Sequence, residues 1–192
     1  LEGALTWACE FEDQPYFAGF PALASNGINL PVLNVFRMFG RMSGTRVAVT
    51  SSGAVPLDDM VRRGVRGSPD VSALAAFDAR RLAVLVWHYH DDDVPGPGAS
   101  VELALSGLPL RNGEARLTHY RMDEQHSNAY AAWKRMGSPL APGRTQYDEL
   151  LAGSELATLR DAPARTAPRD AATTLKFVLP RQAVSLVVVE WD

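Results

Sequence analysis

The stretch LAVLVWHY at residues 82–89 is apolar on both faces of an extended chain, and AVSLVVV at residues 183–189 has the same character. Runs of this length that are apolar on both faces are typical of strands in the middle of a two-layer core. Residues 101–106 and 174–179 instead alternate apolar with polar side chains, which is the pattern of a half-buried strand. These four stretches predict a mostly-β protein.

Weaker strand patterns and turn signals complete the prediction for the larger part of the chain. Candidate strands lie at residues 45–50, 71–78 and 115–122, and the turn signals include Pro-Gly-Pro-Gly at 95–98. A total of about seven short strands predicts an antiparallel β-sandwich over residues 44–192. A short helical insertion is expected around residues 127–152, with Ser127 and Thr145 as the N-caps of two helices.

Residues 1–43 follow a different pattern, that of one strand, one loop and one helix. The strand is expected over residues 3–9, and the helix begins near Pro31 with Asn29 as its N-cap and ends before Gly44. A unit of this size cannot bury its own apolar stripe. We therefore expect it to be the last unit of a larger α/β domain, and the chain, which opens without Met, to be a piece of a longer protein.

Composition excludes several classes of protein. The chain has 192 residues, of which 46% are apolar and 21% charged, and a net charge of −3 without a concentrated basic face, so nucleic-acid binding is not expected. One cysteine excludes a disulfide within the chain and a multi-cysteine zinc site. No apolar run approaches the ~18 residues of a membrane helix. The composition is that of a soluble globular protein, and it leaves open whether the compartment is cytoplasmic, periplasmic or extracellular.

Aromatic and acidic residues converge just beyond the expected first strand, at Trp7, Glu12 and Asp13. In a (β/α)8 barrel, active-site groups lie at this end of a strand. An aromatic face stacks on the apolar faces of a sugar ring, and carboxylates accept hydrogen bonds from its hydroxyls. The alternative is a solvated acidic loop that follows an ordinary strand.

Two other groups have weaker claims to chemistry. The run His88-Tyr89-His90-Asp91-Asp92-Asp93 places two histidines on one strand face beside three acids, which would suit a metal, but a strand that enters a charged turn explains it as well. Cys9 would be a thiol nucleophile or, more simply, a small buried hydrophobe. We expect no bound metal and no cofactor.

Longer stretches of the chain resemble the glycoside hydrolase family 39 β-xylosidases, most closely their bacterial branch. The resemblance rests on GALTWA at 3–8, FEDQPYFAG at 11–19, LPVLNVFRMF at 30–39, VWHYHDDD at 86–93, HSNAYAAWKRMG at 126–137 and LPRQAVSL at 179–186. These proteins hydrolyse xylosides from the non-reducing end, with a catalytic (β/α)8 TIM barrel followed by a β-sandwich. The resemblance implies that residues 1–43 are the last βα unit of the barrel and that residues 44–192 are the accessory sandwich.

The same resemblance implies a division of roles within the active site. The mechanism is retaining, and its acid/base and nucleophile glutamates lie on earlier barrel strands, so this chain would contain no catalytic residue. Trp7 matches the tryptophan that walls the glycone subsite, and Glu12 and Asp13 match an acidic pair that holds sugar hydroxyls. Cys9 departs from the family pattern, in which an aromatic residue is usual.

The implied partners are a xylose or xylo-oligosaccharide substrate and the missing N-terminal part of the barrel. A rival interpretation is a stand-alone β-sandwich that binds carbohydrate or protein without catalysis. The sequence shows no ladder of aromatic residues along an exposed strand, which such a module usually has.

Overall fold

The computed structural model describes residues 8–11, 13–19, 22–109, 114–160, 165–166 and 172–191. Contacts group the described residues into two compact units. The first unit draws on Leu1–Arg37 and Met122–Ala157, and the second on Met38–Arg121 and Thr158–Asp192. Within the described ranges, no helix is long and apolar enough to cross a membrane.

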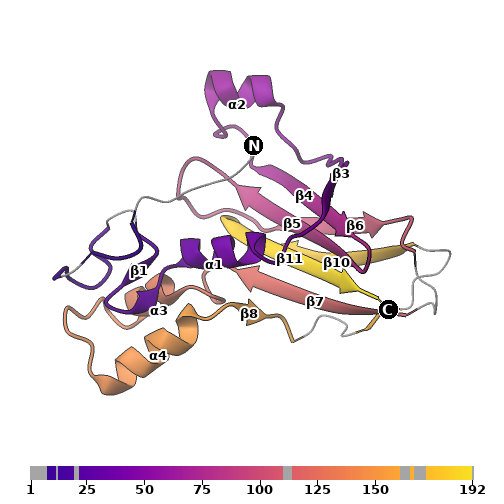
Figure 1. Ribbon diagram of the computed structural model, residues 1–192. Coiled ribbons are helices and arrows are strands. Elements are labelled where there is room, and N and C mark those ends of the chain that lie inside the picture. Colours follow the sequence, from indigo (N-terminus) through magenta and orange to yellow (C-terminus); the bar gives the residue numbers. More distant parts are fainter. Residues whose placement is uncertain are drawn as a thin grey trace. The chain divides into compact units, whose positions relative to one another are not determined.

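The second unit is built on β-sheet, which confirms the mostly-β prediction (Figure 1). The larger sheet has the strand order β3-β4-β5-β11-β7-β8, and β9 pairs with β7. Its strands are β3 (Thr45–Val47), β4 (Asp70–Asp78), β5 (Arg81–Tyr89), β7 (Ala115–Met122), β8 (Ala157–Thr158), β9 (Arg165–Thr166) and β11 (Ala183–Glu190). A second sheet pairs β6 (Ala99–Leu105) with β10 (Thr173–Leu179) in antiparallel fashion.

The two runs that are apolar on both faces form neighbouring central strands, as predicted. In the antiparallel register, Leu85 of β5 lies between Leu74 of β4 and Leu186 of β11. Leu85 is 3% exposed and Leu186 is fully buried. A strand that is flanked by two others and covered on both faces is mostly apolar on both sides, which is why these sequences lack alternation apart from the buried polar residues His88 and Ser185.

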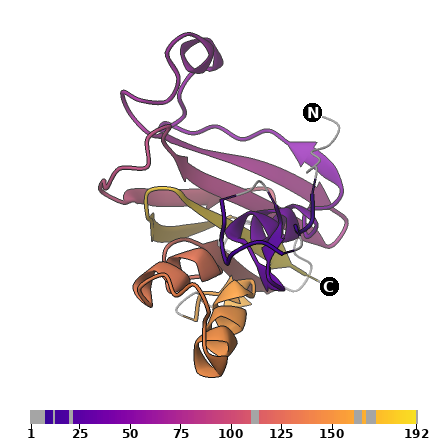
Figure 2. The same ribbon diagram turned by 90° about the vertical axis from the view of Figure 1, so that its left-hand side faces the viewer.

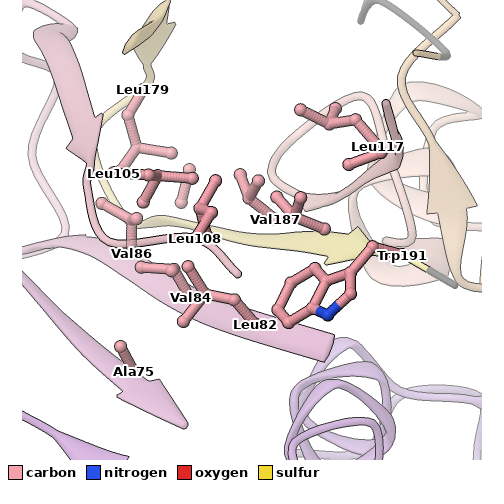
Figure 3. Close-up of a cluster of buried hydrophobic side chains, with 13 residues drawn as sticks. Ala75, Leu82, Val84, Val86, Leu105, Leu108, Leu117, Leu179, Val187 and Trp191 are labelled. Carbon is pink, nitrogen blue, oxygen red and sulfur yellow. The ribbon is translucent and has the colours of Figure 1, made fainter. Parts of the chain in front are cut away.

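Both sheets contribute to one hydrophobic core, drawn in Figure 3. Val84 and Val86 of β5 and Val187 of β11 come from the large sheet, while Leu105 of β6 and Leu179 of β10 come from the small one. Val101, Leu103, Leu175 and Phe177 pack against this cluster from the small sheet at alternate positions. The two-residue period in the sequence therefore marks the face that the small sheet turns to the core.

The helix of the N-terminal region is confirmed as α1 (Pro31–Phe39). Its expected cap is wrong, because Asn29 lies in the short strand β2 (Ile28–Asn29), which pairs with β1 (Ala24–Ser25). Asn26 and Gly27 join the two strands with φ of 52° and 77°. Asn-Gly is the usual sequence of a tight hairpin turn with positive φ at both positions. This signal could have predicted the hairpin, which the sequence analysis did not include. The expected strand at residues 3–9 lies mostly outside the described residues.

Two helices occupy the region expected to be helical, α3 (Ala129–Arg135) and α4 (Arg144–Ser154), and both of their expected caps are wrong. Asn128 caps α3, and its side-chain oxygen accepts a hydrogen bond from Ala131 N at 2.9 Å. Ser127 has a φ of 55°, and its Oγ instead accepts from Ala157 N at 2.8 Å. Helix α4 begins two residues earlier than an N-cap at Thr145 implies, after Gly143.

The helical region packs with the N-terminal segment in the first unit. Ile28, Phe17 and Leu150 are buried together with Ala129 and Ala132, and Figure 2 shows α3 and α4 side by side. The predicted domain boundary between residues 43 and 44 stays a prediction. Contacts within this chain, however, group residues 122–157 with residues 1–37.

One further helix, α2 (Leu57–Arg63), was not expected from the sequence. Its signals are acids in the first turn, Asp58 and Asp59, and bases in the last turn, Arg62 and Arg63. Charges in this order complement the helix dipole. The helix was missed because it is short and none of its residues is buried, so it lacks the apolar stripe by which helices are recognised.

Candidate functional site

The described part of the predicted sugar site is Asp13, which is exposed and has a φ of 55°. Trp7 and Glu12 lie outside the described residues. Phe11 and Gln14, the residues on either side of the predicted acidic pair in the sequence, line a pocket in the first unit. Asp13 itself is not among the residues that line this pocket.

Hydrogen bonds to the β1–β2 hairpin fix the loop that carries Asp13. Cys9 O accepts from Leu23 N at 2.9 Å and from Ala24 N at 2.8 Å. Glu10 Oε1 accepts from Gly27 N at 2.7 Å. These contacts hold residues 9 and 10, just before the predicted acidic pair, against the segment that contains the hairpin. Glu10 is engaged in holding the loop.

The other side of the loop is held by aromatic packing. Phe17 N donates to Ser25 Oγ at 2.8 Å, and the Phe17 ring lies 5.1 Å from the ring of Trp133 and 5.8 Å from that of Tyr130. Phe17, Ser25 and Tyr130 all line the pocket. Sequence reasoning assigned Tyr130 and Trp133 to a helix but did not connect them with the site, since a contact between residues this far apart leaves no periodic signal.

The pocket is apolar and aromatic, and Lys134 Nζ lies 5.4 Å from the centre of the ring of Tyr130, which lines it. Its lining residues are Phe11, Gln14, Pro15, Phe17, Ala18, Gly19, Ala22, Ala24, Ser25, Leu30 and Tyr130. The first Lys or Arg in the chain is Arg37, whereas Glu10, Glu12 and Asp13 all precede it. Aromatic faces beside hydrogen-bond acceptors are the groups that bind neutral carbohydrates.

The run from His88 to Asp93 is engaged in separate structural bonds. His88 Nδ1 lies 3.0 Å from Leu179 O, while His90 Nδ1 accepts from Asp92 N at 3.0 Å. Asp91 Oδ2 accepts from Val65 N at 2.8 Å, and this bond is the main reason why the pKa of Asp91 is lowered. In the described part of the chain, no group of three or more His, Cys, Asp or Glu side chains is arranged to hold a metal ion. The strand-and-turn interpretation fits these contacts.

Cys9 and Ser185 are considered as nucleophiles. Cys9 is exposed, which overturns the expectation of a buried side chain. Ser185 Oγ lies 2.9 Å from His119 Nε2, but Ser185 is fully buried and its Oγ also accepts from Arg121 Nε at 2.8 Å. Burial lowers the pKa of His119 to about 4, with the Arg121 charge as the second cause. A serine closed off from solvent in this way has no access to a substrate.

A mostly-β fold with an aromatic pocket in its N-terminal segment is consistent with part of a carbohydrate-active enzyme. Residues 5–171 match Glycosyl hydrolases family 39. The chain therefore belongs to this family of glycoside hydrolases.

The curated relatives that match the chain have two different activities. The chain is 24% identical over 148 residues to a beta-xylosidase of Caldicellulosiruptor saccharolyticus, a match that covers 77% of this chain and 27% of the relative. It is 30% identical over 167 residues to an alpha-L-iduronidase of Mus musculus, covering 83% of this chain and 25% of the relative. The chain thus spans about a quarter of the length of these relatives.

Solved structures agree in fold. The family 39 enzyme of Xanthomonas axonopodis pv. citri matches with a TM-score of 0.74 at 18% identity, over 93% of this chain and 34% of that chain. A monomeric beta-xylosidase from Caulobacter crescentus matches with a TM-score of 0.69 at 20% identity, over 92% and 34%. A bacterial orthologue of human α-L-iduronidase also matches, with a TM-score of 0.69 at 22% identity, over 86% and 28%.

Proposed function

We propose that this chain is the C-terminal portion of a retaining β-xylosidase. In this proposal, residues 1–43 are the last βα unit of a TIM barrel, and the β-sandwich after it braces the barrel. The proposal is supported by the match of the chain to glycosyl hydrolase family 39 and by an aromatic-lined pocket in the N-terminal segment, whose lining includes Phe11 and Gln14 on either side of the predicted acidic pair. The chain supplies one rim of the glycone subsite and no catalytic residue.

The chemistry is divided between this rim and groups outside the chain. Retaining hydrolysis uses one carboxylic acid to protonate the leaving oxygen and a second carboxylate, about 5 Å away, as nucleophile. Glu12 and Asp13 accept hydrogen bonds from sugar hydroxyls, and the Trp7 ring stacks on the apolar face of the sugar. These contacts hold the ring in position for attack, so binding energy away from the anomeric carbon lowers the barrier.

The charge of the N-terminal segment favours a xyloside over an iduronide as substrate, although Lys134 of α3 lies over the ring of the pocket residue Tyr130. An iduronide carries a carboxylate, which is bound in proteins by Arg or Lys. Residues 1–36 contain no Lys or Arg but several acids, including Glu12 and Asp13. Acidic residues at this rim would repel a uronate, whereas they would bind the hydroxyls of a neutral pentose.

The substrate is tested on the full-length parent protein with a chromogenic β-xyloside and a fluorogenic α-L-iduronide. We expect the kcat/KM for the xyloside to exceed that for the iduronide roughly a hundredfold or more, since an uncompensated charge in a site costs several kcal/mol. The 192-residue chain alone should hydrolyse neither substrate. Preferred hydrolysis of the iduronide would overturn the proposed specificity, and activity of the chain alone would place catalytic residues within it.

The role of the acidic rim is tested by Glu12→Ala in the same parent protein. We expect a loss in kcat/KM equivalent to about 1.5–3 kcal/mol, because the variant lacks a charged acceptor for sugar hydroxyls. The matched control is Glu149→Ala on the exposed side of α4, which should leave the kinetics unaltered. If Glu12→Ala behaves like the control, Glu12 does not belong to the site.

A further inference from the structure

The aromatic pocket of the first unit stands on a tightly packed base. Its volume is about 140 Å³, and its described lining residues all belong to the first unit. Phe17, which lines the pocket, also belongs to the buried cluster that contains Ile28 and Leu150, and both of these are fully buried. Walls that are held in this way need little rearrangement to accept a ligand.

Tyr130 of α3 gives the pocket a fixed aromatic wall. Its ring lies 5.8 Å from the ring of Phe17 and is stacked on that of Trp133 at 5.9 Å. The start of α3 is held as well, because Asn34 Nδ2 donates to Ser127 O at 2.9 Å. Tyr130 is nevertheless 42% exposed. The structure thus holds in place an aromatic surface that is open to solvent.

The pocket offers few hydrogen bonds to a polar ligand. Among its described lining residues none is charged, and polar side-chain atoms come only from Gln14, Ser25 and the hydroxyl of Tyr130. Ser25 Oγ already accepts from Phe17 N at 2.8 Å and donates to Asn26 Oδ1 at 3.1 Å. A sugar hydroxyl that loses water without gaining a partner is penalised. A second xylose, which carries hydroxyls around its ring, is therefore a poor fit.

The size of the pocket matches one aromatic ring. An apolar cavity of about 150 Å³ binds benzene, and this pocket has a volume of about 140 Å³. Aromatic rings pack favourably on one another when they are offset or tilted, and Phe11, Phe17 and Tyr130 all line the pocket. Transfer of an aromatic ring from water to these walls also buries apolar surface, which is favourable.

We propose that this pocket is the aglycone subsite of the parent glycosidase, and that it binds an aromatic aglycone in preference to a second xylose. This inference rests on the proposed function, in which Glu12 and Asp13 hold the glycone. Phe11 and Gln14 are the sequence neighbours of that pair, and both line the pocket. The group attached to the glycone in a xyloside is the aglycone, so it is the group that such a neighbouring pocket receives.

A cation near the pocket defines the alternative ligand, an acidic aglycone. Lys134 Nζ lies 5.4 Å from the centre of the Tyr130 ring. The Lys134 side chain is exposed, and the field of an exposed charge is screened by water and salt. We therefore assign the selectivity to the apolar walls. A carboxylate on the aromatic ring should add nothing to binding.

The test compares benzyl β-xyloside with methyl β-xyloside and xylobiose, as substrates of the full-length parent. Their leaving groups are all unactivated alcohols, so the substrates differ chiefly in the group that reaches the pocket. We expect the kcat/KM for the benzyl xyloside to exceed the other two roughly tenfold, because the ring is removed from water. A para-carboxybenzyl xyloside should not be hydrolysed faster than the benzyl xyloside.

Two variants change the pocket itself. Tyr130→Ala removes one wall and should lower the benzyl-to-methyl ratio of kcat/KM roughly threefold or more. Ala24→Leu fills the pocket from a half-buried lining position and should abolish the preference. The matched control is Tyr89→Ala, because Tyr89 is 47% exposed and lies in the second unit. A ratio of two substrates on one sample does not depend on the amount of folded enzyme, so partial unfolding cannot imitate the effect.

Binding of benzyl alcohol to the 192-residue chain tests the pocket without hydrolysis. Saturation-transfer NMR should detect the bound alcohol in wild type and in Tyr89→Ala, and should not detect it in Ala24→Leu. The proposal is overturned if wild type does not bind it, if Ala24→Leu binds it equally, or if the carboxybenzyl xyloside is preferred. A parent that hydrolyses xylosides without preference for benzyl refutes this inference alone. A parent that prefers an iduronide, with benzyl alcohol bound in the pocket, refutes the proposed substrate alone.

Discussion

Asn34→Ala should lower the free energy of unfolding of the chain by about 2–4 kcal/mol, because two buried hydrogen bonds are lost. Asn34 is fully buried, and its side-chain Nδ2 donates to Ser127 O and to Ser154 O, each at 2.9 Å. One amide of α1 thus holds both the start of α3 and the end of α4. Alanine offers no donor to either buried carbonyl oxygen.

The measurement for Asn34 is urea denaturation of the 192-residue chain, followed by the fluorescence of the tryptophans. The matched control is Asn29→Ala, since the Asn29 amide is at the surface and 3.5 Å from Glu155 Oε1. Its effect should stay within about 0.5 kcal/mol. A loss for Asn34→Ala as small as that of the control would show that the amide does not hold the helices to α1.

The second large effect is a loss of stability in acid that depends on His119. Burial, with the Arg121 charge, lowers the pKa of His119 from 6.5 to about 4 in the folded protein. The unfolded chain therefore binds a proton at a higher pH than the folded chain does. The free energy of unfolding is therefore unaffected by His119 above pH 6.5. As the pH falls from 6.5 toward 4, it decreases by a total of about 3 kcal/mol.

The hydrogen bonds around His119 fit the neutral form that burial and the Arg121 charge favour. Arg121 Nε donates to Ser185 Oγ, so the hydroxyl of Ser185 is free to donate to Nε2 of His119 at 2.9 Å. A protonated imidazole would place a second positive charge beside Arg121, which is 4% exposed. The fold thus holds an unprotonated histidine in the core.

Unfolding free energies measured from pH 7 to pH 4 test this prediction. The control is His119→Gln, which retains an acceptor for the Ser185 hydroxyl but does not titrate in this range. The carboxylates whose pKa values are lowered, such as Asp91 and Asp123, contribute equally in both proteins. Wild type should lose more stability than the variant between pH 6.5 and 4. If the free energies of unfolding of the two proteins changed in parallel with pH, this would contradict the low pKa of His119.

Most of the β-structure could be predicted from local pattern. Residues 82–89 and 183–189 form the central strands, as their nearly continuous apolar runs predict for strands that are buried on both faces. The strand expected at residues 115–122 has those bounds as β7. The helix after Pro31 was also predictable, since proline favours the first turn.

Local pattern failed where a residue's partner is distant in the chain. Ser127 and Asn128 are both good capping residues, and the choice between them depends on Ala157, whose N–H engages the Ser127 hydroxyl. Helix α2 was missed because a helix without buried residues has no stripe. The predicted sugar site is described only at Asp13, and its aromatic neighbour Tyr130 comes from α3.

The sequence by itself determined the long strands, the helix after Pro31 and the apolar faces of the sheets, because burial acts on each position in turn; the exposed helix α2 lacked that signal. Only the tertiary structure decided which segments meet. The grouping of residues 122–157 with residues 1–37 depends on the amide of Asn34 and the ring of Phe17. Such contacts join residues about a hundred positions apart, where neither periodicity nor local propensity extends.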